Sequence, residues 1–136
     1  MSKPIKSILL VDDDEATNYI HEVVIKRFDP DIQVIAVENG QEAVEYLQSI
    51  NENGSHPCPD LILLDINMPI MNGWEFLANY KNLPLNQKGD IIVVMLTTSL
   101  NPDDKLRAEQ IEEIDDFANK PLTKDLFTEI ANKFFS

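Results

Sequence analysis

Short apolar runs of four to six residues recur along the chain, separated by segments with the spacing of amphipathic helices. This alternation is typical of β-α units that build a parallel sheet, because parallel strands need long crossover connections. Four of the five predicted strands are largely apolar, as expected where helices cover both faces of a sheet. The strands are predicted at 7–11, 33–37, 61–64, 91–96 and 116–118.

Five helices are predicted between and after these strands. The first spans about 15–28 and buries a stripe of apolar residues, namely Ile20, Val23, Val24 and Phe28. The second begins at 39–40, buries residues as far as Ile50 and stops before 53–54. The third begins near 73, the fourth at Asn101-Pro102 and the last after 121. Asn101 is a predicted N-cap, and a proline is favourable at the first helical position.

The length of 136 residues suits one domain that buries its own core without metal or disulfide staples. We expect a single domain at 1–136, with a core at about 5–135 and no output domain. The chain carries 24 acidic and 11 basic residues, a formal net charge of -13. This charge argues against nucleic acids and anionic membrane surfaces as partners, because both require a basic face.

Cys58 is the only cysteine, so neither an intramolecular disulfide nor a multi-cysteine metal site can form. No apolar run approaches the roughly 20 residues of a membrane-spanning helix. These features predict a cytoplasmic protein. The two histidines, His21 and His56, are too scattered for a zinc site and are predicted to have ordinary surface roles.

Carboxylates follow two of the apolar strands at the point where each strand ends. Asp12 and Asp13 follow the first strand and Asp65 follows the third. In the strand order 2-1-3-4-5 these two strands are neighbours, and ligands bind at the carboxyl ends of such strands. Like charges that close repel by roughly 4 kcal/mol per pair, so a divalent cation is the natural compensation. Magnesium is predicted, because the candidate ligands are hard oxygens, including a backbone carbonyl near Asn67.

A simpler interpretation applies to part of this pattern. Asp14 fits an N-cap of the first helix, and Asp65 by itself is compatible with the start of a turn. Capping does not account for Asp65 together with Lys120, a lysine near the far end of the chain that can counter the charge of a phosphoryl group.

Five motifs occur in the order and at the separations of a known family: Val11-Asp12-Asp13-Asp14, Leu64-Asp65-Ile66-Asn67-Met68-Pro69, Asn72-Gly73, Leu96-Thr97-Thr98 and Lys120-Pro121. Over nearly its whole length the chain resembles the receiver domains of response regulators, in particular the stand-alone, chemotaxis-regulator-like type. The resemblance implies an α/β, flavodoxin-like (βα)5 fold, a three-layer sandwich around a parallel sheet. It also implies a two-component, phosphorelay signalling protein that promotes its own phosphorylation and dephosphorylation and is not a dedicated metabolic enzyme.

The resemblance assigns a role to each matching position. It implies that Asp65 is the phosphoryl acceptor and that Thr97 and Lys120 contact the phosphoryl oxygens. The implied Mg²⁺ ligands are Asp12, Asp13, Asp65 and the backbone carbonyl of Asn67.

The family's switch pair would be Thr97 and Phe117, and the peptide bond between Lys120 and Pro121 would be cis. The implied phosphoryl donor is a phosphohistidine of a sensor histidine kinase or of a histidine phosphotransfer protein, and the implied output is a downstream protein. The chain would be a monomer or a weak dimer through the face made by the fourth helix, the fifth strand and the fifth helix.

Two other functions share parts of this pattern. A Mg²⁺-dependent phosphohydrolase would also form an aspartyl phosphate, but such enzymes usually place an Asp two residues after the nucleophile, where this chain has Asn67. A flavin carrier shares the strand order, but its first loop should be rich in Gly, Ser and Thr, and here it is acidic.

Overall fold

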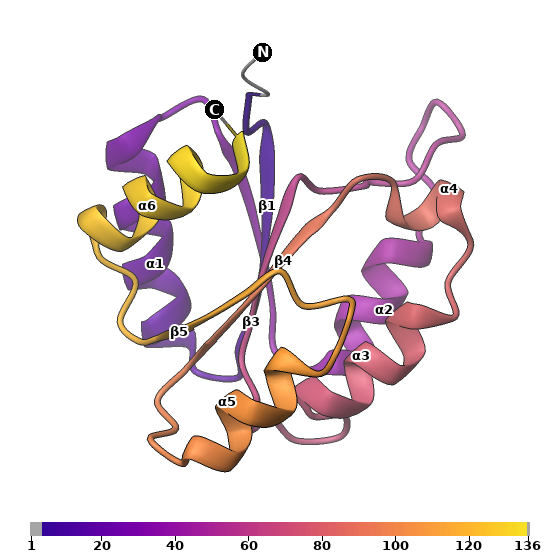
Figure 1. Cartoon of the computed structure of the whole chain (residues 1–136). Coiled ribbons are helices and arrows are strands. Elements are labelled where there is room, and N and C mark those ends of the chain that lie inside the picture. Colours follow the sequence, from indigo (N-terminus) through magenta and orange to yellow (C-terminus); the bar gives the residue numbers. More distant parts are fainter. Residues whose placement is uncertain (1–3, 136) are drawn as a thin grey trace.

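A computed structural model describes residues 4–135, and Figure 1 shows a central sheet with helices on both sides. Residues 1–3 and 136 of the predicted domain lie outside the described residues. The sheet is parallel throughout, with the order β2-β1-β3-β4-β5, which confirms the predicted order and the flavodoxin-like fold. The strands are β1 (Ser7–Val11), β2 (Gln33–Val37), β3 (Leu61–Leu64), β4 (Ile92–Thr97) and β5 (Asp116–Asn119).

The strand predictions agree with the structure to within one residue. β4 begins and ends one residue later than predicted, and β5 extends one residue further. All four residues of β3 are buried, because helices cover both faces of the sheet at its centre.

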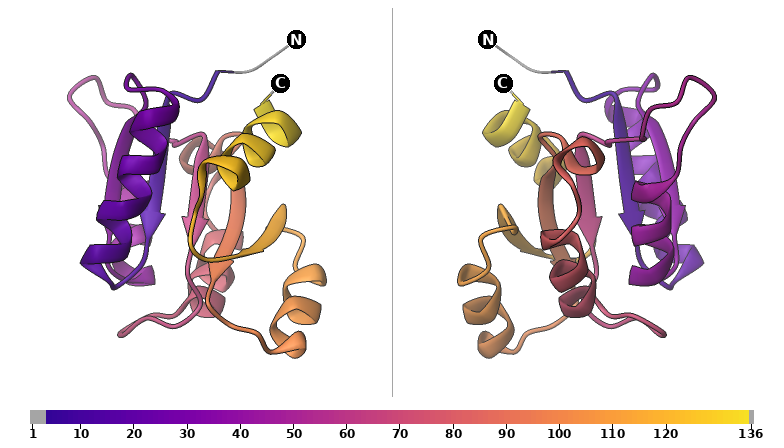
Figure 2. Two further views of the ribbon diagram at one scale, coloured as in Figure 1. Left: turned by 90° about the vertical axis from the view of Figure 1, so that its left-hand side faces the viewer. Right: turned by 90° about the vertical axis from the view of Figure 1, so that its right-hand side faces the viewer.

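Two groups of buried side chains lie on the two faces of the sheet. On one face, residues of α2 and α3 pack with Leu9, Val11, Ile62 and Leu64 of the central strands. On the other face, α1 and α6 cover the alternate strand residues, and Figures 1 and 2 show these two helices on the same side of the sheet. The alternation follows from the two-residue period of a strand, which sends successive side chains to opposite faces.

The helices are α1 (Glu15–Phe28), α2 (Gly40–Gln48), α3 (Gly73–Lys81), α4 (Leu85–Lys88), α5 (Pro102–Glu109) and α6 (Lys124–Phe135). The five predicted helices are present, and α4 is an additional single turn. Pro84 precedes α4, and Gly89, with φ 58°, ends it. The helix between them has too few residues to show the apolar spacing from which a helix is predicted. Among residues 4–135, no helix combines the length and the apolar character that crossing a membrane requires.

Three side chains predicted to be buried are exposed in the structure. Ile50 is 68% exposed because α2 ends at Gln48, before the turn that would have buried this side chain. On α1, Ile20 and Phe28 are 53% and 42% exposed, and the buried residues are Asn18, His21 and Ile25. Two polar residues can lie on this face because each makes a hydrogen bond inside the protein.

Candidate functional site

The carboxylates that follow β1 and β3 meet at the carboxyl edge of the sheet, the lower edge in Figure 1. In the register of the two strands Val11 lies opposite Leu64, so the next residues, Asp12 and Asp65, are also neighbours. One carboxylate oxygen from each of Asp12, Asp13 and Asp65 lies within 4.8 Å of the others. The predicted convergence of these three side chains is therefore confirmed, and together they can hold a divalent metal ion.

Backbone and side-chain hydrogen bonds fix Asp12 in position. Its N–H donates to the Val37 carbonyl at 3.1 Å, and its own carbonyl accepts a bond from Asn18 Nδ2 at 2.8 Å. Its Oδ1 accepts the N–H of Asp14 at 3.0 Å, and the side chain is buried. Asp13 is exposed, so the site has one fixed and one solvent-facing carboxylate after β1.

Asp14 caps α1 as predicted, because its Oδ1 accepts the N–H of Ala16 and its Oδ2 accepts the hydroxyl of Thr17 at 2.6 Å. The capping interpretation is thus correct for Asp14. Neither Asp12 nor Asp65 takes part in this cap, so capping does not explain their positions.

Asp65 is buried, and its two oxygens have different environments. Oδ1 accepts the N–H of Ile66 at 2.8 Å, and Oδ2 lies 3.3 Å from the ammonium of Lys120. Burial raises the pKa of Asp65, and the charge of Lys120 opposes this effect while that of Asp12 adds to it. Lys120 therefore favours the ionised carboxylate, which is the nucleophilic form.

Lys120 connects the far end of the chain to both strand ends. Its ammonium contacts the carboxylates of Asp12 and Asp65, and its N–H donates to the Thr97 carbonyl at 2.9 Å. The peptide bond between Lys120 and Pro121 is cis. A fixed positive charge thus lies beside the acidic cluster, where it can act on an anionic group.

The loop from Asp65 to α3 is held close to the site by two residues. Gly73 lies so near the chain that a Cβ added to it would be 2.3 Å from the Asp65 carbonyl oxygen, so only glycine fits. Asn72 caps α3 in a capping box with Glu75. Asn67 is exposed in this loop, two residues after Asp65.

The two predicted switch residues lie on adjacent strands. Thr97 ends β4, is buried, and its hydroxyl oxygen accepts the N–H of Ser99 at 3.1 Å. Phe117 lies opposite Met95 in β5 and is partly buried against the core.

The prediction of a surface role for His21 is wrong. The side chain is 3% exposed, and its Nε2 accepts the N–H of Leu122 at 3.2 Å. Asn18, which holds the Asp12 carbonyl, lies one turn earlier on the same face of α1. The three-residue spacing of Asn18 and His21 places them on one helix face and could have indicated that both are buried. A search for apolar residues alone does not detect a buried face that carries polar side chains.

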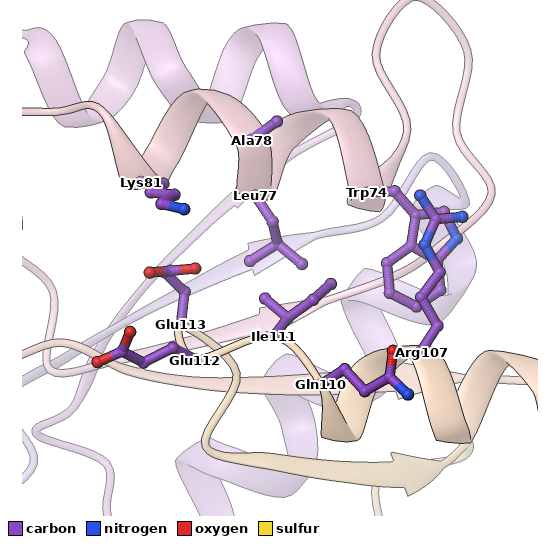
Figure 3. Close-up of a pocket in the computed structure, with 9 residues that line it drawn as sticks. All are labelled: Trp74, Leu77, Ala78, Lys81, Arg107, Gln110, Ile111, Glu112 and Glu113. Atoms are coloured by element: carbon purple, nitrogen blue, oxygen red, sulfur yellow. The ribbon is translucent and has the colours of Figure 1, made fainter.

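A cavity of about 540 Å³ lies away from the acidic cluster, between α3 and the segment around the end of α5 (Figure 3). Leu77 and Ile111 point toward each other across it, and the Arg107 guanidinium lies 4.3 Å from the ring centre of Trp74. None of the strand-end carboxylates lines this cavity.

The sequence of the chain matches the model of one protein family, the response regulator receiver domain, over residues 8–132. Response regulator Rcp1 of a Synechocystis strain is 37% identical over 126 residues, which are 93% of this chain and 84% of that protein.

Solved structures agree with this match. A two component response regulator from Cytophaga hutchinsonii superimposes with a TM-score of 0.85 at 32% identity, over 97% of this chain and 98% of that chain. The Mn(2+)-bound form of response regulator Rcp1 gives a TM-score of 0.73 at 36% identity, over 93% of this chain and 90% of that chain. The chain therefore belongs to the response regulator receiver domains and is a phosphoacceptor protein of two-component signalling, not a metabolic enzyme.

Proposed function

We propose that Asp65 accepts a phosphoryl group from a phosphohistidine on a sensor histidine kinase or a histidine phosphotransfer protein. The observation that carries this proposal is the cluster of Asp12, Asp13 and Asp65 oxygens within 4.8 Å, with the Lys120 ammonium 3.3 Å from Asp65 Oδ2. Phosphoryl transfer depends mainly on positioning and on neutralising the phosphoryl oxygens, and this arrangement offers both.

In the proposed reaction a carboxylate oxygen of Asp65 attacks the phosphorus. The new O–P bond forms while the N–P bond of the phosphohistidine breaks, and the donor imidazole leaves with the electron pair. The nucleophile needs no general base, because an aspartate carboxylate is ordinarily ionised at neutral pH and Lys120 opposes the rise in the pKa of Asp65 that burial causes. The bond from Ile66 N–H to Oδ1 limits rotation of the carboxylate and so orients it for attack.

The residues around Asp65 fit a divalent cation. Asp12, Asp13, Asp65 and the backbone carbonyl of Asn67 would hold Mg²⁺, because all four supply the hard oxygen ligands that it prefers. A bound Mg²⁺ would neutralise charge on the phosphoryl oxygens. The Mn(2+)-bound structure of Rcp1 supports a divalent metal in a related protein.

The remaining roles concern the phosphorylated state. Lys120 would pair with a phosphoryl oxygen, and the Thr97 hydroxyl would donate to another after leaving Ser99. A movement of Thr97 would let Phe117 turn inward and alter the face formed by α5, β5 and α6. A full reversal of a two-state equilibrium from 1:99 to 99:1 requires about 5.5 kcal/mol of differential interaction.

The altered face would act on a downstream protein or form a weak dimer. We assign the reaction to the cytoplasm, whose reducing conditions suit the free Cys58. We further propose that the site promotes loss of the phosphoryl group to water, which a time course of the labelled protein measures.

The test is labelling with acetyl phosphate and Mg²⁺, followed by intact mass spectrometry. The unmodified protein should gain the mass of one phosphoryl group, and Asp65→Asn should gain none. Asp31→Asn is the matched control, because Asp31 is exposed beside the amino end of β2, at the opposite edge of the sheet. Labelling of Asp65→Asn, or equal labelling in EDTA, would show that the assigned acceptor or the metal requirement is wrong.

The phosphohydrolase alternative has its own readout in the same samples. Repeated turnover of a small phosphate ester by the unmodified protein would favour it, whereas a single labelling event per chain favours the signalling role.

A further inference from the structure

His21 is a buried titratable residue that the proposed reaction does not use. It lies on α1, while the bond that it accepts comes from Leu122, in the segment that links β5 to α6. Figure 1 shows this segment beside the lower, amino-terminal part of α1 before it enters α6. The bond therefore joins two parts of the chain that are distant in sequence and that flank the acidic cluster.

This bond holds the backbone on the far side of Lys120. The N–H of Lys120 donates to the Thr97 carbonyl at 2.9 Å, which ties the segment to the end of β4. Pro121 has no N–H, so the N–H of Leu122 is the next backbone donor along the chain. Because Leu122 is 1% exposed, the His21 imidazole replaces the water that this N–H would otherwise need.

The two bonds fix the loop from opposite sides. One anchor is on β4 and the other is on α1, and Lys120 and Pro121 lie between them. His21, Lys120 and Pro121 also line one cavity of about 230 Å³ beside the site. The lysine ammonium sits on a long flexible chain, so its reach to Asp65 depends on where this loop holds its backbone.

We infer that His21 is a positioning residue for Lys120: by accepting the N–H of Leu122, it holds the Lys120 loop where the ammonium reaches the group bound to Asp65. This role rests on the proposed function. His21 touches neither the phosphoryl group nor Asp65 and acts only through the loop.

The environment of His21 favours the form that accepts a hydrogen bond. Burial, followed by the positive charge of Lys120, lowers the pKa of His21, and the charge of Asp12 acts in the opposite direction. The neutral ring with its proton on Nδ1 presents an unprotonated Nε2 to Leu122. A protonated ring would instead place a donor against the N–H donor.

The first experiment compares rates of acetyl phosphate labelling at saturating Mg²⁺, at a temperature at which every variant is folded by circular dichroism. His21→Leu keeps an apolar side chain in the site but has no acceptor, and it should label between about 10- and 100-fold more slowly. His21→Gln offers a carbonyl oxygen near the position of Nε2 and should remain within about threefold of the unmodified rate.

The control for a general loss of packing is Ile25→Ala. Ile25 is fully buried on the same face of α1, one turn further along, in the same apolar cluster as Leu122. Its side chain has no hydrogen-bond acceptor for the Leu122 N–H, so this variant removes packing but leaves the His21 bond in place. This variant should be less stable but label at the unmodified rate once folded.

A double variant tests whether His21 acts through Lys120. In a Lys120→Gln background, His21→Leu should change the labelling rate by less than about twofold, because the group being positioned is gone. If the two substitutions slow labelling independently, so that the double variant shows the product of their separate effects, the inference is overturned. It is also overturned if His21→Leu labels at the rate of the unmodified protein, or if folded His21→Gln labels slowly.

A measurement on the unmodified protein covers the case in which His21→Leu does not fold. Nitrogen-15 NMR at neutral pH should show an unprotonated Nε2 on His21 and an amide of Leu122 protected from hydrogen exchange. A protonated Nε2 or a rapidly exchanging amide would overturn the inference. Absence of any labelling on Asp65 would instead refute the proposed function, so the two failures are distinguishable.

Discussion

Replacement of Gly73 by alanine should displace the loop that carries Asp65. Gly73 opens α3, and its N–H donates to the Ile66 carbonyl at 2.8 Å. A Cβ at this position would lie 2.3 Å from the Asp65 carbonyl oxygen and 3.1 Å from Ile66 Cα. Non-bonded heavy atoms normally approach to about 3.5 Å, so the two backbone segments would have to separate by about 1 Å. Neither obstacle is a side chain that can rotate away.

The change in the free energy of unfolding caused by Gly73→Ala is the sum of two opposing effects. Overpacking of this kind destabilises by about 1–3 kcal/mol, and Gly73→Ala should be near the upper limit because all the obstructing atoms are backbone atoms of Asp65 and Ile66. Alanine is favoured over glycine by up to about 1 kcal/mol in a helix interior, and by less at the first helical position. We expect a net loss of about 2–3 kcal/mol, which lowers the Tm by roughly 6–12 °C for a domain of this size.

The assay is thermal denaturation in EDTA, followed by acetyl phosphate labelling of the folded variant. Gly54→Ala is the control, because Gly54 has φ 83° and no atom within 4 Å of an added Cβ. It should lose only about 1–2 kcal/mol through backbone strain and label normally, whereas Gly73→Ala should also label slowly. A Tm of Gly73→Ala within about 2 °C of the unmodified protein would refute the steric reasoning.

Three further perturbations test other parts of the structure. Asn72→Ala removes the capping box of α3 and should lower the free energy of unfolding by about 1 kcal/mol in urea titrations. Lys120→Gln removes the ammonium between two carboxylates, so Mg²⁺ should raise the Tm of this variant more than that of the unmodified protein; an equal rise would contradict this. Burial, and then the charge of Lys120, holds the pKa of His21 below 6.5, while the charge of Asp12 acts in the opposite direction. Below pH 6.5 the unfolded state therefore binds more protons than the folded state, so the free energy of unfolding should fall as the pH is lowered. Urea titrations at several pH values from about 5 to 7 give the free energy of unfolding at each pH, and this free energy should change less with pH in His21→Gln than in the unmodified protein.

Much of the fold was predictable because its signals are local in sequence. Strand boundaries were correct to within one residue, since apolar runs buried on both sides contrast with their polar flanks. The N-caps at Asp14 and Asn101 were correct for the same reason, because a cap depends on a few adjacent residues. The convergence of Asp12 and Asp65 followed from the strand order together with their positions after β1 and β3.

Features that depend on a distant partner were missed or wrongly predicted. Ile20 and Phe28 are more exposed than their apolar spacing on α1 indicated, because the buried face is chosen by what α1 packs against. The α4 turn has too few residues to show any period. His21 looked like a surface residue because its acceptor role depends on Leu122, which lies 101 residues later in the chain.

The order of residues along the chain sets which chemical groups are present and after which strands the carboxylates follow, because both depend on residue type and on a period of two or 3.6 residues. How these groups are held depends on contacts that form only in the folded protein. The contacts of the Lys120 ammonium, the close approach of Gly73 to the Asp65 carbonyl and the burial of His21 join segments that are separate in the chain. No local period encodes such contacts, because they exist only once the sheet and both helical layers have assembled.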